Sequence, residues 1–142
     1  MRRDKIEIII HIMWTTWNRD FLLTPELEID LFPILIEMGE RHKAKTIRVN
    51  GVPDHVHWLV KFSSTTRLCD LVKDAKGTSS QFLNEQLGNF KWRPTYAAYS
   101  VSPWNVRQIA AYIAGQKEHH ALKTFKPRLE PGQDQDAFVD GE

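Results

Sequence analysis

The chain has 142 residues, enough for one domain with one core, and its 42% hydrophobic and 26% charged residues exclude a low-complexity or membrane-embedded protein. No apolar run could cross a bilayer, no small-residue cleavage site follows the N-terminus, and the lone Cys69 excludes an internal disulfide, so we expect a cytoplasmic protein without a membrane partner. The net charge of +1 excludes a strongly basic protein, although residues 1–129 carry 19 basic against 13 acidic side chains and suit a polyanionic partner.

The first half of the chain predicts a strand, a helix and a hairpin. Residues 5–14, KIEIIIHIMW, are β-branched and place the even-numbered isoleucines and Trp14 on one face, with His11 on the other. In the following helix, TPELEIDLFPILIEMGERH, Thr24 is the expected N-cap, while Pro33 predicts a kink or an early end. In TIRVNGVPDHVHWLVKF, Asn50-Gly51 predicts the two-residue turn of a hairpin.

The second half predicts a helix over residues 66–86 with a possible break at Gly77, an extended stretch over residues 95–102, and a last helix opened by Ser102-Pro103. The order β-α-β-β-α-β-α predicts an α+β fold with helices packed on an antiparallel sheet. The final residues 130–142, EPGQDQDAFVDGE, contain five acids and no base, which predicts a disordered acidic tail after a domain of residues 1–129.

Two histidines one residue apart are the first candidate site. Side chains alternate across a strand, so His55 and His57 share one face while Val56 and Trp58 share the other. Two imidazoles side by side can chelate a metal ion, although a third ligand must come from elsewhere. An equally good interpretation is a pair of satisfied histidines on a solvated face. Asp54 is expected on the opposite face, where it orients the turn.

The last helix carries the second candidate site. Val106, Ile109, Ala110 and Ile113 form its core stripe, and Tyr112 and Gln116 are neighbours, at i and i+4, on the flank beside that stripe. A tyrosine in this place is usually packing and a glutamine is usually solvated, so the helix alone favours no chemistry.

Together these segments resemble a known family. PDHVHWLV, KGTSSQFLNE and YSVSPWNVRQIAAYIAGQKEHH, in this order, are similar to the small single-tyrosine HUH transposases of insertion sequences, the IS200-like transposases, which are related to the REP-associated tyrosine transposases. The resemblance covers residues 6–126 and implies a ferredoxin-like or RRM-like sheet. It implies His55 and His57 as metal ligands, Gln116 as the third ligand and Tyr112 as the nucleophile. The departure is at Thr95 and Ala97, where the family often has glycine.

The resemblance also implies an activity. A transposase of this kind is a DNA-binding enzyme of DNA transposition and DNA recombination that cleaves and rejoins single-stranded DNA through a 5′-phosphotyrosine, assisted by Mg²⁺ or Mn²⁺. The expected partners are single-stranded DNA with hairpin ends and a second copy of the chain in a homodimer, in which the tyrosine helix could complete the partner's site.

Basic and aromatic residues are candidates for holding DNA, because bases stack on exposed aromatic rings and phosphates attract cations. Trp14 and Trp58 are expected in the core instead. The candidate DNA-binding residues are Arg19, Lys91, Arg93, Trp104, Arg107, His119, His120 and Lys123.

Three other interpretations compete with a mobile element's transposase. A histidine-triad nucleotide hydrolase would need a third alternating histidine, and this position is Leu59. A non-catalytic module for single-stranded nucleic acid would bind without a metal or a covalent adduct. A domesticated REP-type nuclease acting on chromosomal repeats would keep the same chemistry, and the sequence does not separate it from a transposase.

Overall fold

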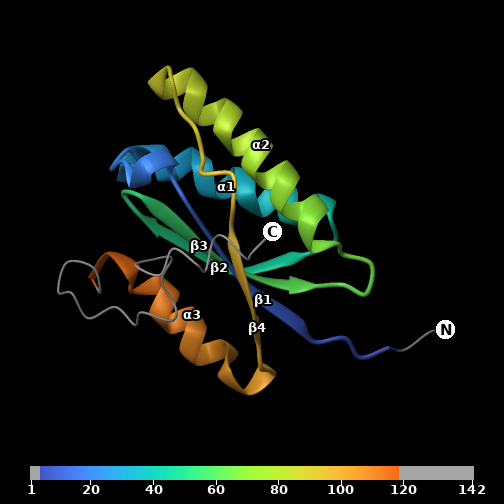
Figure 1. The fold of residues 1–142 in the computed structure, drawn as a ribbon. Helices are drawn as coiled ribbons and strands as arrows, with labels where there is room; N and C mark the ends of the chain where they lie inside the picture. The colour runs from blue at the N-terminus through green and yellow to red at the C-terminus, as the bar shows by residue number, and fades with distance from the viewer. Residues whose placement is uncertain (1–3, 119–142) are drawn as a thin grey trace.

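A computed structural model describes residues 4–118, which form four strands and three α-helices with two short 3-10 helices (Figure 1). The predicted tail, residues 130–142, lies outside the described residues. The elements in chain order are β1 Ile8–Thr15, η1 Trp17–Arg19, α1 Pro25–Arg41, β2 Lys45–Val52, β3 His55–Phe62, α2 Leu68–Leu87, β4 Ala97–Val101, η2 Pro103–Asn105 and α3 Val106–Ala114.

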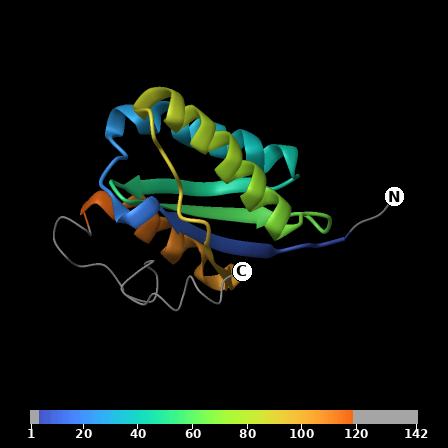
Figure 2. The same ribbon diagram turned by 45° about the horizontal axis from the view of Figure 1, so that its top comes forward.

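The four strands form one antiparallel sheet with the order β2-β3-β1-β4. Helices α1 and α2 cover one face of this sheet, and α3 covers the other (Figures 1 and 2). Strand order, connectivity and the pair of helices on one face are those of a ferredoxin-like α+β fold, as predicted, and α3 adds a layer on the other face. Within the described chain, no helix is long and apolar enough to span a membrane.

The main core lies between the sheet and the pair α1–α2. Trp14 and Trp58, both fully buried, pack edge to face with ring centroids 6.1 Å apart. They belong to a large apolar cluster with Leu31 and Leu35 of α1 and Leu71 of α2. Burial of this much apolar surface is the main source of stability in the fold.

The predicted start of α1 is confirmed, and its predicted interruption is not. Thr24 accepts a hydrogen bond from the amide of Leu27 at 3.3 Å, and Pro25 occupies the first turn. The helix continues through Pro33, because Leu31 and Leu35 anchor both sides of this residue in the core. Proline leaves the carbonyl four residues earlier without its partner. That residue, Ile29, is 72% exposed, so water can reach the carbonyl. In the same way α2 runs through Gly77 without a break.

The hairpin between β2 and β3 turns at Pro53-Asp54, not at Asn50-Gly51 as the sequence predicts. Asn50 and Gly51 lie inside β2, paired with His57 and Val56. The ordinary turn preference of Asn-Gly is overridden by tertiary contacts. A Cβ on Gly51 would lie 3.0 Å from the carbonyl oxygen of His55, so the glycine allows a close approach of the two strands.

Ser102 begins the last structured segment. Its hydroxyl accepts a hydrogen bond from the amide of Trp104 at 3.3 Å, which caps η2 rather than the α-helix itself. Helix α3 follows directly at Val106 and packs mainly on β2 of its own chain.

Candidate active site

The paired histidines stand on the face of β3 that α3 covers. His55 and His57 are fully buried, and their ring centroids are 5.0 Å apart. Their neighbours Val56 and Trp58 point into the core on the other face, as the alternation of the strand predicts. The prediction of a solvated histidine pair is therefore wrong, because α3 closes over this side of the sheet.

Each of the two imidazoles has its Nδ1 atom against another polar side chain. His55 Nδ1 lies 2.7 Å from Asp54 Oδ1, and His57 Nδ1 lies 2.8 Å from His11 Nε2. Asp54 was expected on the opposite face. It belongs to the turn, where strand alternation no longer applies, and its carboxylate therefore reaches back to the histidine that follows it.

Arg19 completes a chain of three residues with Asp54 and His55. The guanidinium Nε donates to Asp54 Oδ2 at 2.9 Å. Burial raises the pKa of the Asp54 carboxyl, but the hydrogen bonds from His55 and Arg19 and the positive charge of Arg19 outweigh it, so the pKa stays below its ordinary value. Asp54 is thus an ionised acceptor at the edge of the site.

Helix α3 brings the predicted nucleophile to the histidine pair. The ring of Tyr112 stands nearly perpendicular to the ring of His57, with centroids 6.5 Å apart. Tyr112 is 6% exposed and Gln116 is fully buried, whereas the helical spacing taken alone favours a packed tyrosine beside a solvated glutamine. Tyr112 in α3 and Gln116, just after the end of α3, are buried because α3 packs on the sheet through an apolar cluster that includes Leu59 and Ile113.

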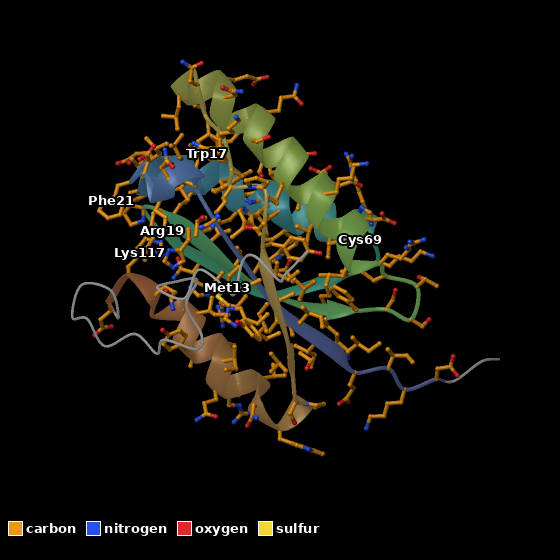
Figure 3. The ribbon with its side chains drawn as sticks, in the orientation of Figure 1. Met13, Trp17, Arg19, Phe21, Cys69 and Lys117 are labelled. Carbon is orange, nitrogen blue, oxygen red and sulfur yellow. The ribbon has the colours of Figure 1, made fainter. Side chains whose placement is uncertain are left out.

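The end of α3 is fixed to the sheet by two polar side chains. Asn50, the strand partner of His57, donates from Nδ2 to the carbonyl oxygens of Ile113 at 3.0 Å and Ala114 at 3.1 Å. Lys117 Nζ lies 2.8 Å from the buried carboxylate of Glu28 and donates to the carbonyl oxygen of Gly51 at 3.1 Å. Figure 3 shows Lys117 and Arg19 at the same end of the sheet.

The donor set of the site suits a divalent metal ion with mixed nitrogen and oxygen ligands. Among residues 4–118, no group of three His, Cys, Asp or Glu side chains could hold a metal ion on its own. A metal here therefore needs a ligand of another type, and the buried amide of Gln116 is such a group. With Nδ1 engaged by the protein, Nε2 is the nitrogen that each histidine would present to the ion.

The other two tyrosines differ from Tyr112 in their surroundings. Tyr96 packs partly buried against the main core, where burial raises the pKa of its phenol. Tyr99 on β4 pairs with His11 on β1 and is 42% exposed. Tyr99 and His11 line a cavity of about 120 Å³ near the start of α3. Tyr99 is therefore the rival nucleophile that an experiment must distinguish from Tyr112.

The candidate DNA-binding residues are spread over several surfaces. Trp104, 90% exposed, and the exposed Arg107 lie where α3 begins. Lys91 is exposed and stands over the ring of Trp17 at 4.9 Å. Arg19 forms an ion pair with Asp54 at the edge of the histidine site, and Arg93 is half-buried. His119, His120 and Lys123 lie outside the described residues.

The predicted core tryptophans Trp14 and Trp58 are confirmed, and Trp92 is buried as well. The indole N–H of Trp92 donates to Ser79 Oγ at 2.9 Å, which removes this ring from any stacking surface. Sequence reasoning did not find the roles of His11, Asn50 and Lys117. Two signals in the sequence were available: Asn50-Gly51 lies in a β-rich run, and His11 interrupts an apolar strand.

A ferredoxin-like sheet that buries two alternate histidines beneath a tyrosine-bearing helix is the architecture expected of a small single-tyrosine transposase. Comparison with known proteins agrees with this class. The family model described as "Transposase IS200 like" matches residues 4–116. The chain belongs to this family of transposases.

Individual relatives support the assignment. The ISDra2 transposase TnpA of Deinococcus radiodurans is 30% identical over 116 residues, which cover 76% of this chain and 83% of that protein. A crystal structure of a Deinococcus radiodurans protein assigned as a transposase has a TM-score of 0.65 at 25% identity, covering 82% of this chain and 98% of its own. A REP-associated tyrosine transposase bound to a REP hairpin shares the fold, with a TM-score of 0.64 at 17% identity over 84% and 73% of the two chains.

Proposed function

We propose that this transposase cleaves and rejoins single-stranded DNA through a covalent 5′-phosphotyrosine on Tyr112, with Mg²⁺ or Mn²⁺ held by His55, His57 and Gln116. The observation that carries the proposal is the packing of the Tyr112 ring on His57 inside one chain. A nucleophile beside two imidazoles that can bind a metal ion suits transfer of a phosphodiester to the protein.

The proposed reaction conserves the energy of the phosphodiester. The phenolic oxygen of Tyr112 attacks the scissile phosphorus, the bond from phosphorus to the 3′ oxygen breaks, and a free 3′-hydroxyl leaves with a proton. The 5′ phosphate stays on the tyrosine. Attack by a second 3′-hydroxyl forms the new DNA junction and returns the phenol of Tyr112.

Position is the main contribution of the chain to this reaction. A tyrosine has an ordinary pKa of about 10, so only a small fraction is phenolate at neutral pH. The divalent ion, when bound, supplies Lewis-acid polarisation of the phosphate. The buried setting of Tyr112 and the attachment of α3 through Asn50 fix the direction of attack, and fixed orientation contributes a large part of catalysis.

The proposed DNA substrate is single-stranded with hairpin ends. This part of the proposal is supported by the fold shared with a REP-associated tyrosine transposase whose structure contains a REP hairpin. Trp104 has an exposed ring and Arg107 an exposed cation near the start of the tyrosine helix. A base of a DNA strand that enters the site would stack on the Trp104 ring, and Arg107 would pair with a phosphate.

Trapping the covalent intermediate tests the proposal. The protein is incubated with single-stranded DNA from around its own gene and Mn²⁺, then digested, and the nucleotide-bearing peptide is identified by mass spectrometry. Tyr112→Phe should abolish the adduct and keep DNA binding, while Tyr96→Phe and Tyr99→Phe should retain it. An adduct on Tyr99, or normal cleavage by Tyr112→Phe, would contradict the assignment.

We also propose that the active form is a homodimer, because exchange of strands requires two DNA ends to be held at once. The closed two-fold arrangement is the commonest symmetry for such an assembly. Sedimentation with and without hairpin DNA checks this. A species of 16.6 kDa alone at micromolar concentration would argue against it.

A further inference from the structure

We infer that Asp54 and His11 are positioning residues that fix the tautomers of His55 and His57, so that both imidazoles direct Nε2 to the same metal ion. The inference rests on the proposed metal site and deepens it. Two separate contacts carry it: Asp54 Oδ1 at 2.7 Å from His55 Nδ1, and His11 Nε2 at 2.8 Å from His57 Nδ1.

The contact of Asp54 admits one tautomer. An ionised carboxylate can only accept, so the neutral His55 ring must carry its proton on Nδ1 and keep the lone pair on Nε2. The carboxylate is itself held in place. Arg19 donates to its other oxygen at 2.9 Å, and the backbone amide of Thr16 donates to the Asp54 carbonyl at 2.9 Å.

The contact of His11 is different, because an imidazole can donate or accept. If His57 is to present Nε2, its Nδ1–H must donate to Nε2 of His11, and His11 then carries its own proton on Nδ1. The rings lie 5.0 Å apart at 30°, and both residues are buried. His11 comes from β1, so this contact also ties the site to a second strand of the sheet.

The two partners should not be equivalent. Asp54 is a charged acceptor whose hydrogen bond both orients His55 and makes its Nε2 a stronger ligand. His11 is a neutral acceptor that mainly orients His57. Loss of Asp54 should therefore weaken metal binding more than loss of His11, within the range of about 10–100-fold that such outer partners contribute.

Nitrogen-15 NMR of histidine-labelled protein tests the inference without metal or DNA. At about pH 8, above the ordinary histidine pKa, each neutral ring shows which nitrogen is protonated. His55 and His57 should both be protonated on Nδ1. His42 provides the opposite reference, because its Nε2 lies 2.7 Å from Asp74 Oδ2. One spectrum therefore contains both the expected Nδ1-protonated rings and an Nε2-protonated reference.

Variants then separate the two contacts. Asp54→Ala should release the Nδ1–H preference of His55 and lower Mn²⁺ affinity about 10–100-fold by calorimetry. Asp54→Asn keeps an acceptor oxygen, so it should keep the tautomer and lose less affinity. Of the histidine signals, His11→Phe should change only that of His57, and it should lower Mn²⁺ affinity less than Asp54→Ala does. His11→Gln should restore part of that affinity.

Asp74→Ala is the matched control, because it removes a carboxylate–histidine contact of the same 2.7 Å length away from the site. It should change the His42 signal and leave Mn²⁺ affinity as it is. Protonation of wild-type His55 on Nε2 would overturn the inference, and so would an unchanged His55 tautomer with unchanged Mn²⁺ affinity in Asp54→Ala. Failure of the wild-type protein to form a DNA adduct would instead overturn the proposed function, and leave the tautomer result standing.

Discussion

Strand β3 contributes alternate residues to two faces of the sheet, and the two faces are built on different principles. Trp58 and its even-numbered neighbours enter an apolar core under α1 and α2. His55 and His57 enter a buried layer under α3 that contains Tyr112 and Gln116. The first face is stabilised by apolar burial, while the second buries polar groups that need hydrogen-bonding partners. One strand thus carries both the stability and the chemistry.

The adjacent residues Trp58 and His57 give the sharpest test of this difference, and Trp58→Ala should have the largest effect on stability. It deletes a fully buried side chain of the apolar core and a hydrogen bond to Thr46 Oγ1 at 2.9 Å. The expected loss is about 3–5 kcal/mol in the free energy of unfolding, measured with urea. A loss below about 1 kcal/mol would show that this face is not the source of stability.

His57→Ala should cost less stability and remove the activity. It removes the buried contact between His57 Nδ1 and His11 Nε2, and loss of such a contact costs about 1–3 kcal/mol. Mn²⁺ binding and the DNA adduct should both disappear, because one ligand of the proposed three-ligand site is gone. Calorimetry and the trapping assay measure the two losses. Normal cleavage by a folded His57→Ala protein would refute the chelating role.

Asn50→Ala should produce a smaller change, confined to the position of α3. Loss of the bonds to the carbonyls of Ile113 and Ala114 should cost about 1 kcal/mol of stability. A displaced nucleophile should slow adduct formation by about 10–100-fold, with faster hydrogen exchange in α3. Asn84→Ala is the control, since Asn84 accepts from the amide of Phe90 at 2.9 Å, near the end of α2, and should leave the adduct rate unchanged. Equal rates in wild type and Asn50→Ala would exclude a role for this contact.

The last expected effect concerns the pH dependence of stability and a half-buried amine beside the apolar face. Burial lowers the pKa of Lys76 from 10.5 to about 8. Between these values the unfolded chain keeps a proton that the folded chain has released, so stability should rise with pH in that window. Lys76→Met should flatten this rise in thermal melts from about pH 8 to pH 10. Parallel curves for the two proteins would contradict the shift.

The two faces of β3 were predictable from sequence, because successive side chains of a strand point to opposite faces of the sheet. Helical spacing predicted that Tyr112 and Gln116 are neighbours, and the resemblance implied their roles. Their burial was not predicted, since helical spacing alone does not say which element covers a flank. His11, Arg19 and Asn50 act through contacts with residues distant in sequence. The contact of Asp54 with His55 was not predicted, because a turn residue does not follow the side-chain alternation of the strand beside it.

The Asn50-Gly51 pair inside β2 also decides how the molecule ages. Glycine offers no side chain to hinder attack of its nitrogen on the Asn50 side-chain amide, and the Gly51 amide donates a hydrogen bond to Asn50 Oδ1 at 2.9 Å. Deamidation would replace the Nδ2 donor by a carboxylate oxygen facing the carbonyls of Ile113 and Ala114, which repel it. In stored protein, loss of cleavage should therefore follow the mass shift of this peptide while the sheet stays folded. The rate of deamidation at Asn50 would then set how long the stored protein keeps α3, and with it Tyr112, in position.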